Sequence, residues 1–374
     1  MKILNLVRFF PKISETFIID NLIGQIESGI ECIIVAYTDP RKSLALEDRQ
    51  LEETKHAIID KYNLMEKTYY IDPNEYGSLT TLIQKEKPDI IQIHFGDLAP
   101  LILQNNDIGN IPLIITYHGI VMPKNSDTRN LASENYRNTF ERADTILTVS
   151  DKWRNDLITL GASKEKVKVH RLGVFYDNFV NKTNYDINNP FSCVSIGRLV
   201  EKKGFHNVIK AVAILQMENI LIKYEIIGDG VEFMKLQNLI AELPQPEFVK
   251  ILGKKDREYI QKELHNYDCF IATSVTAADG DEEGIPVTIM EAAGVGLPII
   301  TTYHGGIPEI IENNVSGILL EENDIEGISN AIKQLMNSTN FRKELGTNAK
   351  KTVLDKYNGY KQKDKLVNMY KSLL

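Results

Sequence analysis

Two glutamates, Glu283 and Glu291, lie on either side of the start of a predicted helix. Pro286 suits the first turn of that helix, because its missing N–H costs no hydrogen bond there. The amides of Gly284 and Ile285 point out from the positive end of the helix dipole, which favours a bound phosphate. Glu291 lies about five residues into the helix, roughly 7.5 Å along its axis. The two carboxylates therefore suit two hydroxylated groups on either side of a diphosphate, the layout of a nucleotide sugar.

A second group of candidate residues follows an apolar strand in the same half of the chain. Gly197 and Arg198 end the strand, and Lys203 precedes a predicted helix. A guanidinium binds phosphate through two parallel hydrogen bonds and an ammonium adds a point charge, so the pair suits a diphosphate. An exposed basic turn is the structural alternative. A third segment, Gly228-Asp229-Gly230, is another glycine-bearing strand exit that brings backbone near a ligand.

Short β-rich apolar runs alternate with helical patterns along most of the chain. The runs are apolar on both faces, which is typical of parallel strands covered by helices on both sides. Strands are predicted at 2–9, 32–37, 89–95, 112–117, 145–149, 167–171, 191–196, 223–227, 249–252, 269–273, 298–302 and 317–320. Helices are predicted at 14–28, 79–87, 129–142, 152–160, 204–217, 231–243, 257–266, 286–295, 325–337, 341–357 and 360–374.

This alternation predicts an α/β fold with two Rossmann-like, doubly wound domains. Residues 176–190 are polar and without periodicity, which indicates a linker. We therefore expect one domain over 1–178 with a returning helix at 358–374, and a second over 190–357. Ligands of such proteins bind at the carboxyl ends of the strands, so we expect a cleft between the domains.

Composition excludes several other classes. The 374 residues carry 51 acidic and 43 basic side chains, a net charge of −8, and both halves are acidic, which argues against nucleic-acid binding. Three scattered cysteines give neither a disulfide framework nor a metal motif. No run approaches the ~20 apolar residues of a membrane span, and the apolar N-terminus is too short for a signal peptide. The expected location is the cytoplasm.

Taken together, these motifs resemble the retaining glycosyltransferases of family 4, which have the GT-B fold. The likeness rests on Gly197-Arg198-Leu199, Lys203-Gly204, Gly228-Asp229-Gly230, the Glu283–Glu291 pair, Gly296–Thr301 and Gly305–Glu309, in order and with family spacing. Phe10–Ile18, Ile93–Gly96 and Asp279–Gly284 also resemble the enzymes that assemble colanic acid, amylovoran and similar bacterial exopolysaccharides. In that family the last helix crosses back to the first domain.

The resemblance implies roles for residues of the second domain. Arg198 and Lys203 would bind the donor diphosphate, Glu291 the ribose hydroxyls, and Glu283 hydroxyls of the transferred sugar. The remaining expected donor contacts are backbone or base contacts, at Gly197, Gly228, Asp229, Gly230, Gly253, Lys254, Gly284 and Ile285.

In the first domain, His118 follows a strand and matches the family's histidine beside the reaction centre. His94 is a candidate acceptor contact, with a capped structural histidine as the alternative. The family often has a glycine-rich loop after the first strand, whereas this chain has Arg8–Thr16. Ser14 and Glu15 in that loop are candidates for acceptor binding, or they cap a helix.

The resemblance also implies retention by attack on the leaving group's own face. Arg198, Lys203 and the helix start would stabilise charge on the diphosphate, so no divalent metal or other cofactor is expected. The segment Asp279-Gly-Asp281 offers the alternative of an Asp-x-Asp metal site. A UDP-sugar donor, with galactose or glucose, is favoured over GDP-mannose. The acceptor would be a glycan or a polyprenyl-diphosphate-linked oligosaccharide, the latter placing the enzyme peripherally at the inner face of the membrane.

Two other functions remain open at this stage. A nucleotide-sugar 2-epimerase shares the two-domain fold but is not expected to combine Glu283 and Glu291 with Arg198 and Lys203. A non-catalytic partner subunit would tend to lose the phosphate-binding residues, which this chain keeps.

Overall fold

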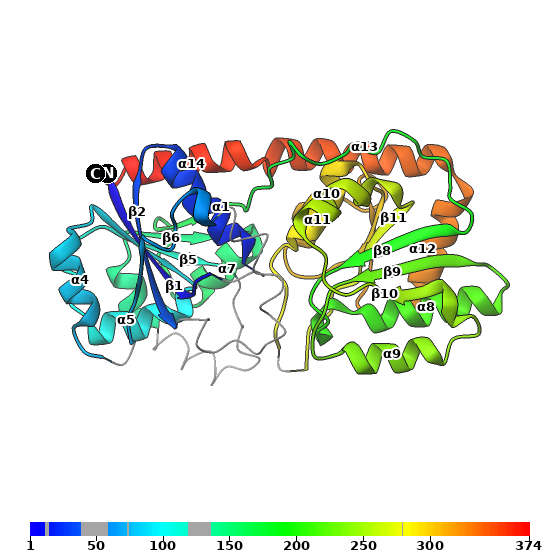
Figure 1. Ribbon diagram of the computed structural model, residues 1–374, viewed down its shortest axis with the longest axis horizontal. Coiled ribbons are helices and arrows are strands. Elements are labelled where there is room, and N and C mark those ends of the chain that lie inside the picture. The colour runs from blue at the N-terminus through cyan, green and yellow to red at the C-terminus, as the bar shows by residue number, and fades with distance from the viewer. Residues whose placement is uncertain (12–14, 39–58, 73–74, 119–135, 279) are drawn as a thin grey trace. The chain divides into compact units, whose positions relative to one another are not determined.

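The computed structural model describes residues 1–11, 15–38, 59–72, 75–118, 136–278 and 280–374 (Figure 1). The chain forms two compact units, each described here by itself. Unit 1 comprises Met1–Gly173 together with Tyr360–Leu374, and unit 2 comprises Val174–Gly359. Unit 2 is therefore inserted into the sequence of unit 1.

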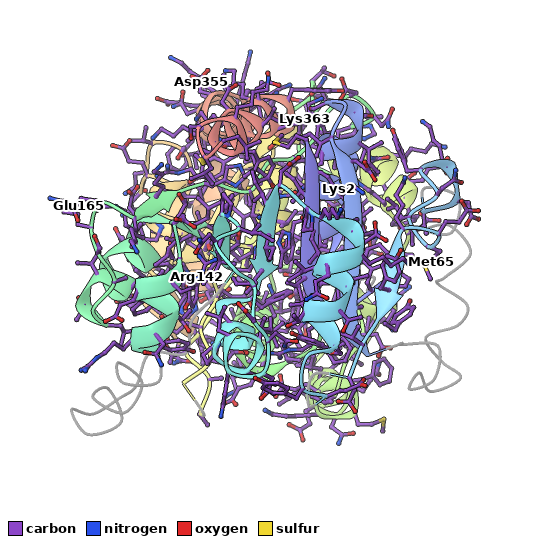
Figure 2. The ribbon with its side chains drawn as sticks, turned by 90° about the vertical axis from the view of Figure 1, so that its left-hand side faces the viewer. Lys2, Met65, Arg142, Glu165, Asp355 and Lys363 are labelled. Atoms are coloured by element: carbon purple, nitrogen blue, oxygen red, sulfur yellow. The ribbon has the colours of Figure 1, made fainter. Side chains whose placement is uncertain are left out.

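The described part of unit 1 holds one sheet of seven parallel strands in the order β3-β2-β1-β4-β5-β6-β7. Its strands are β1 (Lys2–Phe9), β2 (Glu31–Thr38), β3 (Thr68–Tyr70), β4 (Ile90–His94), β5 (Leu113–Tyr117), β6 (Thr145–Thr148) and β7 (Val167–Val169). In Figure 2, Met65 before β3 and Glu165 before β7 mark the two ends of this order, and Lys2 on β1 lies between them. The strand order reverses beside β1, which is the arrangement of a doubly wound sheet.

Helices cover both faces of this sheet, as the strands that are apolar on both faces predict. They are α1 (Thr16–Glu27), α4 (Ser78–Glu86), α5 (Ala99–Asn105), α7 (Asp151–Thr159) and α14 (Gly359–Lys371), with the 3₁₀ turn η2 at Gly96–Leu98. Leu4 and Leu6 of β1 pack in the core that α4, α5 and α7 cover. Val7 packs against α1, and Ile3 packs against α14.

A buried polar network fixes α14 to the sheet. Asn5 and Gln25 exchange two amide hydrogen bonds of 3.0 Å. Gln25 Nε2 also donates to the Tyr370 hydroxyl at 2.9 Å, and that hydroxyl donates to Gln92 Oε1. Since Tyr370 is fully buried, each of these polar groups depends on its partners inside the protein. The expectation that the last helix returns to the first domain is confirmed.

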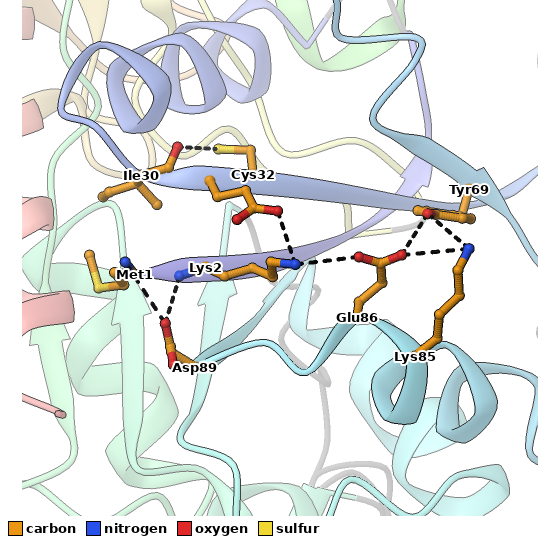
Figure 3. A network of polar contacts seen from close by, with 9 residues as sticks. Met1, Lys2, Ile30, Cys32, Tyr69, Lys85, Glu86 and Asp89 are labelled. Atoms are coloured by element: carbon orange, nitrogen blue, oxygen red, sulfur yellow. Dashed lines mark hydrogen bonds and ion pairs between the residues drawn. The ribbon is translucent and has the colours of Figure 1, made fainter.

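Charged residues close the amino edge of the same sheet (Figure 3). Lys2 Nζ lies 2.9 Å from Glu31 Oε1 and 3.5 Å from Glu86 Oε2. The Tyr69 hydroxyl donates to Glu86 Oε1 at 2.7 Å, and this hydrogen bond, together with Lys2, lowers the pKa of Glu86. The Lys2 amide donates to Asp89 Oδ2 at 2.7 Å. These contacts tie β1, β2, β3 and α4 together at the edge opposite the strand exits.

Unit 2 contains a second parallel sheet, of six strands in its described part, in the order β10-β9-β8-β11-β12-β13. The strands are β8 (Phe191–Ile196), β9 (Ile222–Ile227), β10 (Val249–Ile251), β11 (Cys269–Ala272), β12 (Ile299–Thr302) and β13 (Ile318–Leu320). The helices are α8 (Phe205–Met217), α9 (Phe233–Ala241), α10 (Arg257–Glu263), α11 (Val287–Val295), α12 (Ile325–Asn337) and α13 (Thr339–Lys356). Shorter 3₁₀ turns are η3 (Glu201–Lys203), η4 (Pro246–Phe248), η5 (Leu264–Asn266) and η6 (Ile307–Glu309).

The unit boundary lies earlier than the sequence predicts. Residues from 174 belong to unit 2, whereas we expected the first domain to reach 178 and the second to begin at 190. The segment predicted as a linker packs on unit 2 through side chains: Tyr185 Oη donates to Gly296 O at 2.8 Å, and Lys182 Nζ donates to Tyr267 O at 2.6 Å. Single side chains anchor this segment, so its sequence lacks the periodicity that marks a helix or strand.

Candidate active site

The carboxyl ends of the unit 2 strands meet at one edge of the sheet. Gly197 follows β8, Gly228 follows β9, and Gly253 lies just beyond β10. The amide of Leu199 donates to Asp229 O at 2.9 Å, and that of Gly228 donates to Gly253 O at 3.0 Å. The structure therefore brings together these predicted donor-binding residues: Gly197, Arg198, Gly228, Asp229, Gly230, Gly253 and Lys254.

Gly228 permits the close approach of two of these loops. A Cβ at this position would lie 1.8 Å from the carbonyl oxygen of Gly197, and the φ of Gly228 is +153°. Only glycine fits without moving one backbone away from the other. The need for glycine at position 228 therefore comes from the close packing of the two loops, which holds the exit of β9 beside the exit of β8.

Two consecutive lysines of η3 contact the acidic loop before α11. Lys203 Nζ lies 3.2 Å from Glu283 Oε2, and Lys202 Nζ lies 3.4 Å from Glu283 Oε1. Lys202 Nζ also lies 2.8 Å from Asp281 Oδ2. The side chains of Lys202, Lys203 and Glu283 are at most 15% exposed, so solvent screens these ion pairs less than it screens surface pairs.

Glu283 is held in its charged form. Burial alone would raise its pKa, but the ammonium groups of Lys203 and Lys202 outweigh burial and lower the pKa to about 2. A carboxylate in this state accepts hydrogen bonds and does not donate a proton near neutral pH. This suits contact with hydroxyl groups and excludes Glu283 as a general acid.

The helix that carries Glu291 begins one residue later than expected. Pro286 is the N-cap residue of α11, and Glu291 is a half-buried side chain on its second turn. Gly284 and Ile285 directly precede this start. The Tyr176 hydroxyl donates to Met290 O at 3.1 Å, which fixes the early unit 2 segment against the same helix.

Sequence reasoning missed three residues around Glu283, namely Lys202, His304 and Glu322. The amide of Glu283 donates to His304 Nε2 at 2.9 Å. His304 Nδ1 lies 2.6 Å from Glu322 Oε1, so polar contacts link Glu283 through His304 to Glu322. Each of the three follows a strand exit, of β8, β12 and β13 respectively. The rule that parallel strand ends share one edge could have found them.

In unit 1, the two candidate histidines contact each other. His94 Nδ1 and His118 Nε2 are 3.2 Å apart, and the rings stack with an interplanar angle of 9°. His94 has 0% exposure, which leaves no surface for the acceptor contact that the sequence suggests for it. The ring of His118 is half-buried and packs 4.5 Å from the ring of Phe17 between centroids.

Both histidines are neutral near physiological pH. Burial lowers the pKa of His94 to about 3, with His170 adding to the effect. Burial, followed by His94 and His170, also lowers the pKa of His118 well below its usual range. One ring must donate its proton to the other across the 3.2 Å contact. His94 Nε2 and His118 Nδ1 are buried and form no hydrogen bond with the described residues.

The remaining candidates are two loop residues of unit 1 and the Asp-x-Asp segment of unit 2. Ser14 lies outside the described residues. Glu15 occupies the N-cap position of α1, where its side chain makes no capping hydrogen bond within the described chain. Asp279 of the Asp-x-Asp alternative is also outside the described residues, and Asp281 pairs with Lys202.

Within the described ranges, no group of three or more His, Cys, Asp or Glu side chains is placed to hold a metal ion. None of the described helices is both long enough and apolar enough to cross a bilayer.

Two family models match consecutive parts of the chain. Residues 14–176 match the model described as Glycosyltransferase Family 4, and residues 180–352 match Glycosyl transferases group 1. The amylovoran biosynthesis glycosyltransferase AmsK of Erwinia amylovora is 30% identical over 382 residues, covering 90% of each chain. The chain belongs to glycosyltransferase family 4. The family resemblance predicted from the motifs is confirmed.

A second relative agrees with this family 4 assignment, and two solved structures show the fold. The putative colanic acid biosynthesis glycosyltransferase WcaL of Escherichia coli K12 is 29% identical, covering 86% of this chain and 87% of its own. HepE of Anabaena, solved in complex with UDP, superposes with a TM-score of 0.80 at 20% identity over 100% of both chains. Sucrose-phosphate synthase of Thermosynechococcus elongatus gives 0.77 at 14% identity, covering 100% of this chain and 99% of its own. The fold is GT-B, as predicted.

Proposed function

We propose that this family 4 glycosyltransferase transfers a hexose, with retention of configuration, from a UDP-sugar to a glycan or lipid-linked acceptor. The pairing of Lys203 with Glu283 beside the start of α11 is the observation that carries the proposal. It sets a cation that suits phosphate next to an ionised carboxylate that suits hydroxyl groups, near a helix N-terminus, and a nucleotide sugar carries its diphosphate next to its sugar.

Each residue then has a distinct task. Arg198 and Lys203 bind the diphosphate, Glu291 binds the ribose, and Glu283 binds hydroxyls of the transferred sugar. In unit 1, His118 contacts the reacting sugar, as the family resemblance implies. The complex of HepE with UDP supports uracil as the base of the donor. The names of AmsK and WcaL support exopolysaccharide synthesis as the setting.

The reaction proceeds by attack on the leaving group's face. The acceptor oxygen forms a bond to the anomeric carbon while the bond from that carbon to the diphosphate breaks, and the departing phosphate oxygen takes the acceptor's proton. Negative charge grows on the diphosphate, where Arg198, Lys203 and the α11 dipole stabilise it, so no divalent metal is required. With a polyprenyl-linked acceptor the enzyme works peripherally at the inner membrane face.

Two measurements test this function. Thermal-shift screening against UDP-, GDP- and ADP-sugars should show stabilisation by the UDP compounds, and stabilisation by none would revive a non-catalytic partner.

Arg198→Ala or Lys203→Ala should lower turnover, measured with EDTA present, by about 100-fold or more, because one lost contact to the developing charge costs on the order of 2.7–4 kcal/mol. Near-normal turnover in both variants, with unchanged folding, would sink the assignment.

A further inference from the structure

The backbone at Glu283, like its carboxylate, has bonding partners within unit 2. Its amide donates to His304 Nε2 at 2.9 Å. The next peptide is held from the same turn, because the amide of Gly306 donates to Gly284 O at 2.8 Å. A Cβ at Gly305 would lie 2.0 Å from the carbonyl oxygen of Glu283, so the two backbones are in close contact. The turn after β12 therefore bonds to the backbone at Glu283 and at the residue that follows it.

The chemistry of the contact fixes the tautomer of His304. Nε2 can accept the amide proton of Glu283 only if it carries a lone pair, so the ring proton sits on Nδ1. Nδ1 donates to Glu322 Oε1 at 2.6 Å. A carboxylate that accepts from one imidazole nitrogen fixes both the orientation of the ring and the accepting role of the other nitrogen. His304 is 3% exposed, so water does not compete well for these contacts.

Glu322 is itself held in place. Its Oε2 accepts from the amide of Thr276 at 2.8 Å, and its Oε1 accepts from the Thr276 hydroxyl at 3.2 Å. Thr276 belongs to the loop after β11, and Glu322 follows β13. The chain Thr276–Glu322–His304–Glu283 thus ties three strand exits to one carboxylate-bearing residue.

We propose that His304 and Glu322 are positioning residues that set Glu283 in the place where it binds the donor sugar. This inference rests on the proposed role of Glu283 and assigns no contact with substrate to His304 or Glu322. Misplacing a substrate-binding group by about 1 Å can cost on the order of 100-fold in rate, even when the substitution lies away from the chemistry. Binding of the nucleotide alone does not use Glu283 and should be preserved.

A matched pair of variants tests the role of His304. In His304→Gln, the side-chain amide reaches the position of Nε2, so Oε1 can still accept from the Glu283 amide. In His304→Asn, the shorter side chain reaches only the position of Nδ1, so the Glu283 amide loses its acceptor. We expect His304→Asn to lower kcat/KM for UDP-glucose by about 10- to 100-fold. The Kd for UDP should stay within about threefold in both variants. His304→Gln keeps an acceptor for the Glu283 amide but loses the contact to Glu322, so its kcat/KM should fall less than that of His304→Asn, by about three- to tenfold.

Each outcome decides a separate point. If both variants turn over UDP-glucose normally, or both lose activity and UDP binding equally, the positioning role of His304 is wrong. If the Asn variant does not fold, Glu322→Gln serves instead, since a neutral amide keeps the shape and weakens the contact to Nδ1. That variant should also lower kcat/KM without changing UDP affinity, and an unchanged kcat/KM would overturn the inference. If the unsubstituted protein neither binds UDP nor uses a UDP-sugar, the proposed function fails independently.

Discussion

Glu283 combines a negative charge with a largely buried side chain, 13% exposed. Its two lysine partners come from consecutive positions of η3, so both carboxylate oxygens are occupied from one side. In the proposed function, a donor diphosphate that binds Lys203 would compete with this ion pair and leave Glu283 to accept hydrogen bonds from sugar hydroxyls.

The depressed pKa of Glu283 predicts how its stabilising effect depends on pH. The pKa falls from about 4.3 in the unfolded chain to about 2 in the folded protein, so folding gains about 3 kcal/mol at neutral pH. The stabilisation is complete above pH ~4.3 and disappears as the pH falls through about 2. We expect the difference in unfolding free energy between the parent and Glu283→Gln, measured by urea titration, to shrink across that window. A difference that does not vary with pH would contradict the assignment of the pKa to this pair.

Sequence alone could single out Glu283, Glu291, Arg198 and Lys203 as candidate donor-binding residues, because their types and spacing within single loops carry the signal. The shared edge of parallel strand ends could place His304 near Glu283. The hydrogen bond between the two could not be predicted, because it depends on how the loops after β11 and β12 meet. The contact between the neutral His94 and His118 could not be predicted either, because it depends on the register of the neighbouring strands β4 and β5.

At the scale of elements, the strand exits of unit 2 do the positioning, and glycines set how closely they approach. Gly228 and Gly253 offer a matched comparison, because both have positive φ but only Gly228 faces backbone at clashing distance. Gly253 has no atom within 4 Å of an added Cβ.

We expect Gly228→Ala to destabilise the protein well beyond Gly253→Ala. The latter carries only the conformational cost of a left-handed residue, about 1–2 kcal/mol. The former adds a backbone displacement, for a total of about 3–5 kcal/mol. Melting temperatures and UDP affinity of the two variants, measured side by side, check this. Equal losses would mean that the contact between Gly228 and Gly197 relaxes without cost.

Most elements could be predicted from apolar runs, because strands buried on both faces leave a continuous signal. The strand predictions at 2–9 and 191–196 match β1 and β8 residue for residue. The sequence misses β3 and α5, which are three and seven residues long. A three-residue strand has too few positions to show a pattern, and α5 carries a proline in its first turn. Of the predicted helix 129–142, the part before 136 lies outside the described residues.

At the scale of the whole molecule, net charge proves a poor guide to the ligand. The chain carries −8 overall, yet the proposed phosphate contacts lie where Lys202, Lys203 and Arg198 gather at one sheet edge. Local cation placement next to a helix start outweighs an acidic total, because short-range charge interactions in a partly buried site are screened least.

The packing of α14 on unit 1 predicts that two tyrosine substitutions on this helix change the free energy of unfolding by different amounts. Tyr370→Phe removes a hydroxyl that bonds to Gln25 and Gln92 in the core, leaving buried amide groups unsatisfied. We expect a loss of about 1–3 kcal/mol in unfolding free energy. Tyr360→Phe, on the same helix but 46% exposed, is the control and should change stability by less than about 0.5 kcal/mol. Similar values for both would show that the buried network adds nothing to helix docking.

The insertion of unit 2 within unit 1 has a consequence for how the protein is made. A ribosome completes all of Val174–Gly359 as one continuous stretch before it adds Tyr360–Leu374, and only then can Tyr370 meet Gln25 and Gln92. Unit 1, although it begins first, is therefore the last to acquire its full core during translation. A stop codon at position 360 would leave unit 2 with its entire sequence and deprive unit 1 of a helix that covers one face of its sheet.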